Sequence, residues 1–425
     1  MQARRVAITG IGVISPYGGD LNHFFERLLA GESAVSHLLT EDLPRPLSTP
    51  FVSCRGFDAE AALGKPLALM MERFAQLGTA AAFLAWEQAG LARQPAADGG
   101  ESRDEWGCIW GTALGGLSAH ERGSRELWLK GRERLSPLSV VHGMNNAVNA
   151  HISIQLGLGG VSTSHTAACA SSGIAIGEAF RRVRSGDADV MLTGGSDVCQ
   201  SYGVVRAWEA MRVMAPGDAL SAPSACRPFA SDRAGLVLGE GGAALVLEAW
   251  DHALARGARI HGEIVGYGTS CDHSHLVRPS RQGQVRALRA ALAQAGLGPA
   301  DIDYVNAHGT ATVEGDLVEI AALREVFGSS AQAMAVSATK SMHGHLLGAA
   351  GAMEAVVTTL ALREQALPPT AHLAGRIDPA CEGVDHVLQG RRGVPMRAAL
   401  SNSFAFGGSN AVLAFRAPPA EQTTF

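Results

Sequence analysis

The sequence predicts an α/β protein in which short buried strands alternate with amphipathic helices. Short apolar runs recur along the chain, many of them followed by glycine, and segments with helical periodicity lie between them. The 51 glycines show no period and interrupt the apolar runs, as many tight turns in a densely packed protein require. Alternation of the two element types favours helices layered on a sheet.

The predicted elements repeat in two halves of the chain. We expect strands at residues 6–8, 108–110, 190–193, 243–247, 304–306, 335–337 and 412–415, and helices at 73–89, 285–295 and 317–327. In each half a strand leads through a polar segment into a helix, first around Cys169 and then around Lys340 and His345. We therefore expect an N-terminal half at 1–255 and a C-terminal half at 256–425, joined without a Pro- or Ser-rich linker.

The composition argues against several classes of protein. The net charge of −5 disfavours a nucleic-acid binder, although clusters such as Arg181, Arg182 and Arg184 leave an acidic protein partner possible. No apolar run reaches the roughly 18 residues of a membrane-spanning helix, and we interpret 6–14 as a first strand rather than a signal peptide. Seven cysteines without a CxxC pair suit free thiols, so we expect a cytoplasmic protein.

Cys169 is the strongest candidate for a nucleophile. It lies in Ser162-Thr-Ser-His-Thr-Ala-Ala-Cys169-Ala-Ser-Ser-Gly173, before apolar residues at helical spacing and a predicted helix end at Gly186. The positive end of the helix dipole favours a thiolate, so we expect a lowered pKa for this cysteine. The alternative is a buried cysteine that serves as a small apolar side chain.

Two further motifs offer groups for proton transfer. His308 follows an apolar strand in Asn306-Ala-His308-Gly-Thr310-Ala-Thr312, where it suits proton transfer or is an ordinary loop histidine. Lys340, His343 and His345 precede a helix that starts with very small residues. Spacing does not distinguish between these two histidines, and Lys340 alone could be a surface charge.

Phe404 and Phe406 form the fourth motif, Asn402-Ser-Phe404-Ala-Phe406-Gly-Gly-Ser-Asn410. Two aromatic residues beside a Gly-Gly turn suit a movable lid over an apolar channel, and the N–H groups of the turn can stabilise an oxyanion. The alternative is a tight turn between two strands with ordinary core phenylalanines.

Together the four motifs resemble those of the β-ketoacyl-[acyl-carrier-protein] synthases, elongating type II branch, within the thiolase superfamily. The resemblance runs from Val6 to Phe415 and includes Gly194-Gly195, Arg227-Pro-Phe229 with Asp232-Arg233, and Gly239-Glu240-Gly241-Gly242. It implies a thiolase-like five-layer αβαβα fold of two similar halves. It also implies a homodimer, with a heterodimer of related subunits as the other possibility.

The resemblance assigns catalytic roles to the motif residues. Cys169 matches the acylated nucleophile, and His308 and His345 match the pair that promotes malonyl decarboxylation and stabilises the enolate. Lys340 matches the lysine that supports the second histidine. Phe406, with Phe404 beside it, matches the gating aromatic whose backbone N–H joins that of Cys169 in the oxyanion hole.

The resemblance also implies the substrates. Thr310 and Thr312 match contacts to a phosphopantetheine arm, Leu114 a residue at the acyl pocket and Glu319 a buried structural acid. The implied reaction condenses a cysteine-bound acyl chain with malonyl-[acyl-carrier-protein] and adds two carbons in fatty-acid elongation. The expected partner is an acyl carrier protein. We expect no metal or organic cofactor, because decarboxylation supplies the driving force.

Several positions depart from the family pattern. Ala167 stands where threonine is frequent, Val161 and Val313 where proline is frequent, Val277 where threonine is usual and Ser139 where a bulky pocket residue is common. These changes leave the proton chemistry intact and bear on the substrate. The alternative function is therefore a dedicated ketosynthase of a specialised polyene, polyketide or lipid pathway.

Three other interpretations fit the sequence less well. A non-catalytic chain-length-determining subunit would usually lack the nucleophile, which is present here as Cys169. A cysteine hydrolase would need a general base beside this residue and would leave the Phe404/Phe406 turn without a role. A metal cluster at Cys271-Asp272-His273-Ser-His275 lacks further ligands at suitable spacing.

Overall fold

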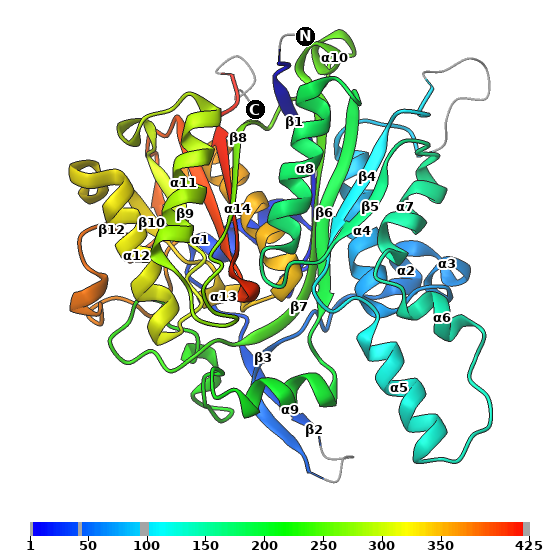
Figure 1. Ribbon diagram of the computed structural model, residues 1–425. Coiled ribbons are helices and arrows are strands. Elements are labelled where there is room, and N and C mark those ends of the chain that lie inside the picture. Colours follow the sequence, from blue (N-terminus) through cyan, green and yellow to red (C-terminus); the bar gives the residue numbers. More distant parts are fainter. Residues whose placement is uncertain (1–2, 41–44, 94–101, 420–425) are drawn as a thin grey trace.

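A mixed sheet of 13 strands organises the computed structural model, which describes residues 3–40, 45–93 and 102–419 (Figure 1). Along its main path the strand order is β12-β10-β9-β14-β15-β8-β1-β7-β6-β4-β5. These strands are β1 (Val6–Ile14), β4 (Gly107–Gly111), β5 (Ser162–His165), β6 (Val190–Val198), β7 (Leu238–Ala249), β8 (Gly262–Cys271), β9 (Tyr304–Asn306), β10 (Ala335–Ser337), β12 (Asp385–His386), β14 (Ala398–Phe404) and β15 (Ser409–Arg416). All seven predicted strand segments fall within them.

The two ends of the sheet repeat one topology. β5, β4 and β6 are parallel, and β7 and β1 continue antiparallel to their neighbours. β10, β9, β14, β15 and β8 show the same succession and the same directions. β1 and β8 pair antiparallel through residues 6–8 and 262–264, which joins the repeats. The repeat confirms the predicted fold of two similar halves, whereas the boundary at residues 255 and 256 stays a prediction.

Helices on both sides of the sheet complete five layers (Figure 1). α8 (Ser171–Ser185) and α14 (Ala350–Glu364) contact each other and form the middle layer. α4 (Arg73–Gln88) and α7 (Ala147–Leu156) cover the outer face of the first half. α11 (Arg281–Ala295), with α12 (Val313–Phe327) beside it, covers the outer face of the second half. The layers are those of the predicted αβαβα fold.

The remaining elements surround this framework. They are the helices α1 (Leu21–Leu29), α2 (Ala59–Leu63), α3 (Lys65–Leu69), α5 (Leu117–Trp128), α6 (Leu138–Gly143), α9 (Tyr202–Ala210), α10 (Trp250–Ala255) and α13 (Lys340–His343), and the pair β11 (Ala366–Leu367) and β13 (Arg391–Arg392). The hairpin of β2 (Ser36–Thr40) and β3 (Leu47–Val52) supplies the last two strands of the sheet, because β3 pairs with β7. Among the described residues, no helix has both the length and the apolar character to cross a membrane.

Burial on both sides explains the nearly continuous apolar sequences of the central elements. Every residue of β1, β6 and β7 is buried. At Gly10 and Gly12 of β1 a Cβ atom would lie 2.1 Å from a carbonyl oxygen of α4, so only glycine permits this close approach. In α14, all residues from 350 to 362 are buried. This part of α14 therefore has no polar face, and any charge within it needs a buried partner.

Candidate active site

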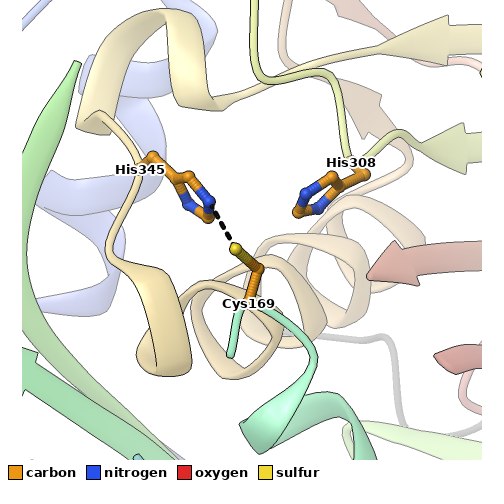
Figure 2. A group of neighbouring side chains, drawn as sticks. All are labelled: Cys169, His308 and His345. Atoms are coloured by element: carbon orange, nitrogen blue, oxygen red, sulfur yellow. Dashed lines mark hydrogen bonds between the residues drawn. The ribbon is translucent and has the colours of Figure 1, made fainter. Parts of the chain in front are cut away.

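Cys169, His308 and His345 point toward one another from three separate segments (Figure 2). The Cys169 Sγ lies 3.0 Å from the His345 Nε2, and the two imidazole rings are 5.4 Å apart between centroids and nearly perpendicular. Each of the three residues is less than 8% exposed. They line one cavity of about 410 Å³, a size that suits a small-molecule site. The structure thus brings the predicted nucleophile and both predicted histidines together.

Cys169 lies in a strained turn between β5 and α8. Ala168 has a φ of 47°, which is uncommon for a residue with a side chain. The Ser171 hydroxyl holds this turn, since it accepts from the Ala167 N–H at 2.9 Å and donates to the Ala168 carbonyl at 2.7 Å. The helix begins at Ser171 and ends before Gly186, whose φ is 90°, as the sequence predicts. The nucleophile therefore precedes the helix start by two residues.

The expectation of a lowered pKa for the Cys169 thiol is wrong. Burial raises its pKa to about 12 and outweighs the opposing effects of the Lys340 charge and of the backbone N–H groups of Phe406 and Cys169. The helix terminus alone thus does not activate the sulfur. A thiolate needs a proton acceptor, and the His345 Nε2 lies at hydrogen-bond distance.

His345, not His343, reaches the cavity. The His345 N–H donates to the Val237 carbonyl at 2.7 Å, and its own carbonyl accepts from the Gly239 N–H at 3.1 Å, so the start of β7 fixes its position. His343 is buried outside the cavity lining, and its Nε2 lies 3.0 Å from the Thr339 Oγ1. The structure resolves a choice that spacing left open.

Lys340 contacts His308 rather than His345, the residue it was expected to support. Its Nζ donates to the His308 carbonyl at 2.7 Å and lies 3.4 Å from the His308 Nδ1. An ammonium group only donates, so this Nδ1 is an acceptor and the ring proton is on Nε2. Burial, followed by the Lys340 charge, holds the pKa values of both His308 and His345 well below the usual range. Both imidazoles are therefore neutral at pH 7 and can each donate one hydrogen bond.

Glu319 of α12 lies beneath the turn that carries His308. Its carboxylate accepts from the backbone N–H groups of His308 and Gly309 at 2.8 Å each and from the Asn402 Nδ2 at 3.0 Å. These contacts fix the backbone at the strand end and fit the structural role that the resemblance implies.

Sequence reasoning missed Glu354, which forms a fully buried ion pair with Lys340. The sequence does contain a sign of its importance, because Glu354 is the lone acid in the apolar stretch from Ala350 to Leu362. Unpaired charges are costly in such a helix, so a glutamate there implies a buried cation elsewhere.

Asp197 of β6 is a second residue that the sequence analysis did not select. Its buried carboxylate accepts four hydrogen bonds, from the Thr112 hydroxyl and from the N–H groups of Ala113, Leu114 and Gly348. It thereby ties the loop after β4 to the segment that follows His345. Its place in the buried strand after Gly194-Gly195 was the available signal.

The predicted binding residues separate into two groups. Thr310, Thr312 and Val277 line the cavity, and the two threonine hydroxyls lie 2.9 Å apart. Leu114 is absent from this lining but packs on the apolar cluster that contains Cys169. Ser139 lies on α6, and the structure does not bring it to the cavity.

Phe404 and Phe406 both line the cavity. The Phe404 ring packs edge-on against His308, with 6.2 Å between the ring centroids. Phe406 begins the turn between β14 and β15, and its backbone N–H acts on the Cys169 sulfur. Two N–H groups, of Phe406 and Cys169, thus converge near the sulfur, as an oxyanion hole requires.

Within the described ranges, only Cys169, His308 and His345 form a group of three possible metal ligands close enough for one ion. These are zinc-type ligands, but the Lys340 charge beside His308 opposes a cation there. In the segment 271–275, Asp272 instead accepts from the Asn410 Nδ2 and the Ser280 N–H. The Asp272 carboxylate therefore stabilises its own loop through these hydrogen bonds.

Known families match nearly the whole chain. Residues 3–253 match the model of the β-ketoacyl synthase N-terminal domain, and residues 261–374 match that of the C-terminal domain. The chain belongs to the β-ketoacyl synthase family. The predicted family and its class, an acyl-transferring condensing enzyme, are thereby confirmed.

Individual relatives are similar over their full length. Nodulation protein E of Rhizobium sp. (strain N33) is 42% identical, with 97% of this chain and 99% of the relative covered. The 3-oxoacyl-[acyl-carrier-protein] synthase 2 of Staphylococcus aureus (strain COL) is 38% identical, with 98% and 99% covered.

Solved structures confirm the thiolase-like fold of this β-ketoacyl synthase. A β-ketoacyl synthase from Burkholderia phymatum STM815 superposes with a TM-score of 0.90 at 33% identity and covers 98% of this chain and 100% of its own. The ketosynthase of the AntDE:AntF complex, bound to a type II polyketide synthase acyl-carrier protein, has a TM-score of 0.85 at 26% identity, with the same coverage.

Proposed function

We propose that this enzyme condenses an acyl chain on Cys169 with malonyl-[acyl-carrier-protein] and forms a β-ketoacyl-[acyl-carrier-protein] two carbons longer, as in fatty-acid elongation. The observation that carries the proposal is the convergence of Cys169, His308 and His345 on one buried cavity, with the Phe406 N–H at the sulfur. Family membership supports the same reaction class.

The first half-reaction loads the acyl chain. The Cys169 sulfur attacks the carbonyl carbon of an acyl thioester, and the carrier thiol leaves with the proton that Cys169 gives up. His345 accepts this proton and returns it to the leaving sulfur, because its Nε2 is 3.0 Å from Sγ. The N–H groups of Cys169 and Phe406 hold the negative charge that develops on the carbonyl oxygen.

The second half-reaction extends the chain. The bond between the malonyl carboxylate and the α-carbon breaks, CO₂ leaves and the electron pair forms an enolate of the thioester. The neutral imidazole of His308 donates a hydrogen bond from its Nε2 to the enolate oxygen. The neutral imidazole of His345 donates a second one after its ring proton, which is on Nδ1 while Nε2 serves as the base for Cys169, has moved to Nε2. The α-carbon then attacks the acyl carbonyl on Cys169, and the sulfur leaves as thiolate.

A dedicated ketosynthase of a specialised pathway is the second candidate. Two observations favour it: the similarity to Nodulation protein E, and the substitutions Val277 and Val313 in the cavity lining. Val277 is apolar where the family pattern has threonine, and Val313 has a backbone N–H that the proline of the family pattern lacks. They change the surface that a substrate arm meets and leave Cys169, His308 and His345 in place.

An acyl carrier protein is the proposed partner, since the AntDE:AntF ketosynthase is bound to one. In this chain Arg212 and Arg278 are exposed and belong to the cavity lining. Their positive charges at the entrance suit the phosphate of a phosphopantetheine arm and acidic side chains around it.

A homodimer is the proposed assembly. β5 stands at the end of the sheet and pairs with β4 alone among the described strands, which leaves one edge open. Beside it, Ile154 of α7 is 73% exposed and Val140 of α6 is 71% exposed. We expect Ile154→Asp to shift sedimentation toward the monomer and Leu220→Asp, at a leucine elsewhere that is even more exposed, to leave it unchanged. A heterodimer would instead appear as a chain that stays monomeric until a related subunit is added.

We also infer a cytoplasmic location. All seven cysteines are free, and five of those besides Cys169 are buried, as expected for a protein that folds without disulfides.

The deciding experiment is intact-protein mass spectrometry after incubation with acyl carriers of different chain length and unsaturation. We expect one acyl mass to be added to the wild type and none to Cys169→Ser. An adduct that persists in Cys169→Ser contradicts the role of this cysteine. Preference for ordinary saturated chains supports elongation, and preference for polyunsaturated or oxygenated chains supports the specialised pathway.

Decarboxylation separates the two half-reactions. We expect Cys169→Gln to release CO₂ from malonyl-carrier while it forms no condensation product, because the glutamine amide can occupy the place of the acyl carbonyl. Loss of both activities in a folded Cys169→Gln protein would contradict the independent role of the histidines.

A further inference from the structure

The ring of Phe406 is stacked on the indole of Trp208. Their centroids are 5.7 Å apart and the ring planes differ by 18°. Both side chains are half-buried and both belong to the lining of the cavity that contains Cys169. The two residues come from distant parts of the sequence, so the stack connects α9 to the turn between β14 and β15.

The Phe406 side of this stack has the backbone of a movable turn. Gly407 and Gly408 follow with φ angles of 82° and 75°, and a Cβ at Gly407 would meet open space. Backbone hydrogen bonds hold the glycine end of the turn, from the Gly407 N–H to the Leu276 carbonyl and from the Asp272 N–H to the Gly408 carbonyl. The aromatic end is held by the Trp208 stack.

The Trp208 side is firmly anchored. The Glu121 carboxylate of α5 accepts from the N–H groups of Tyr202 and Gly203, at 3.1 and 2.8 Å, and so caps the start of α9. Val205 of the same helix is fully buried in the cluster that contains Cys169. The indole of Trp208 is therefore fixed in place, and when the gate opens it is Phe406 that moves.

We propose that Trp208 is a positioning residue: by stacking on Phe406 it keeps the gate closed over Cys169 and sets how readily the cavity opens to an acyl chain. The inference rests on the proposed function for its consequences in turnover. Because the Phe406 N–H acts on the Cys169 sulfur, the same stack also fixes one oxyanion donor. Loss of the indole thus has two opposite effects, easier access to the sulfur and poorer stabilisation of the oxyanion.

The first test measures access without any substrate. Iodoacetamide alkylation of Cys169 is followed by peptide mass spectrometry, with exposed Cys271 as the internal reference. We expect Trp208→Leu to raise the rate at Cys169 relative to Cys271 by about two- to tenfold, the range expected for loss of one aromatic stack. Trp208→Phe keeps a ring for stacking and should restore most of the wild-type rate.

Trp250→Leu is the matched control. Trp250 begins α10 at the opposite end of the molecule from α9 (Figure 1), where its ring packs on Arg5. The Trp250→Leu variant loses the contact of an indole with a guanidinium group and leaves the cavity lining unchanged. An equal rise of Cys169 alkylation in this variant would show general loosening and would overturn the proposal, as would an unchanged rate in a folded Trp208→Leu protein.

The second test compares two kinetic parameters, kcat/KM for acyl loading and kcat for condensation. In Trp208→Leu we expect kcat/KM for loading of long acyl chains to rise relative to acetyl, and kcat for condensation to fall. A purely structural role would lower both together and would overturn the proposal. The alkylation rates do not depend on acyl transfer, so they test the role of Trp208 even if the proposed function is wrong. Conversely, if Trp208 does not control the gate, the acyl adduct on Cys169 still forms and the proposed function still stands.

Discussion

The Lys340 ammonium donates a hydrogen bond to the His308 carbonyl over 2.7 Å, and neither the lysine side chain nor its counter-ion Glu354 has any solvent exposure. The charge acts on the histidine in two ways. It makes the His308 Nδ1 an acceptor and so leaves the proton on Nε2, and it helps to keep this imidazole neutral. The lysine therefore selects the form of His308 that can donate to an enolate.

The pair Lys340 and Glu354 gives the first prediction. Lys340→Met should destabilise the protein by about 3–5 kcal/mol, because it leaves the Glu354 carboxylate buried without a partner. The double variant Lys340→Met/Glu354→Leu should recover most of this stability, since two apolar side chains replace the ion pair. Urea denaturation at fixed protein concentration measures both effects.

The same double variant tests the chemistry. We expect CO₂ release from malonyl-carrier to stay low in it even though the fold is restored, because nothing holds the His308 tautomer. A double variant that is stable and decarboxylates at the wild-type rate would show that the lysine acts only on stability.

His345 gives the second prediction. His345→Ala should slow malonyl decarboxylation by about 10²–10³-fold, the usual effect of removing one donor to a developing oxyanion. His343→Asn is the matched control, because His343 is equally buried and lies two residues away but belongs to no part of the cavity lining. Full decarboxylation in His345→Ala, measured as CO₂ release, would exclude the proposed role.

Asp197 gives the third prediction. Asp197→Asn replaces one acceptor oxygen by a donor that faces N–H groups, so it should destabilise the protein by about 1–3 kcal/mol. Since the carboxylate ties the loop of Leu114 to the segment after His345, condensation should fall more for long acyl chains than for acetyl. Thermal unfolding and kcat/KM for the two chain lengths check this. Asp187→Asn, at an exposed ion pair with Arg182, should change neither the stability nor the kcat/KM values.

The strands and helices of the fold could be predicted from the sequence because each depends mainly on the pattern of apolar residues within its own segment. The buried strand β1 is a nearly continuous apolar run, and the helix after Cys169 ends at Gly186 with the expected left-handed cap. The prediction that Cys169, His308 and His345 meet in space came from the family resemblance. Cys169 lies more than a hundred positions before His308, and α12 and β10 separate the two histidines.

Other features depend on tertiary packing and were therefore not predicted correctly. The thiol of Cys169 has a raised pKa because the finished fold buries it, and a dipole argument from one helix contains no burial. Lys340 points to His308 because α14 places Glu354 beside it. The stack of Trp208 on Phe406 joins two segments that share no sequence signal.

The last prediction concerns pH and a histidine remote from the site. His261 is 2% exposed, and burial, with the charges of Arg363 and Arg259, lowers its pKa to about 3. The Arg363 Nη1 donates to its Nδ1 at 3.2 Å, which fixes the neutral form. In the unfolded chain the same histidine has a pKa of about 6.5.

Between these two pKa values the unfolded state binds a proton that the folded state does not, so stability rises with pH in this window and is lost as the pH falls below about 6.5. From pH 7 to pH 5 this one group should lower the free energy of unfolding by about 2 kcal/mol. His261→Gln keeps an acceptor for Arg363 and removes the titration. Its free energy of unfolding should therefore fall less between pH 7 and pH 5 than that of the wild type. Equal falls in denaturant titrations of the two proteins would show that His261 accepts a proton in the folded state.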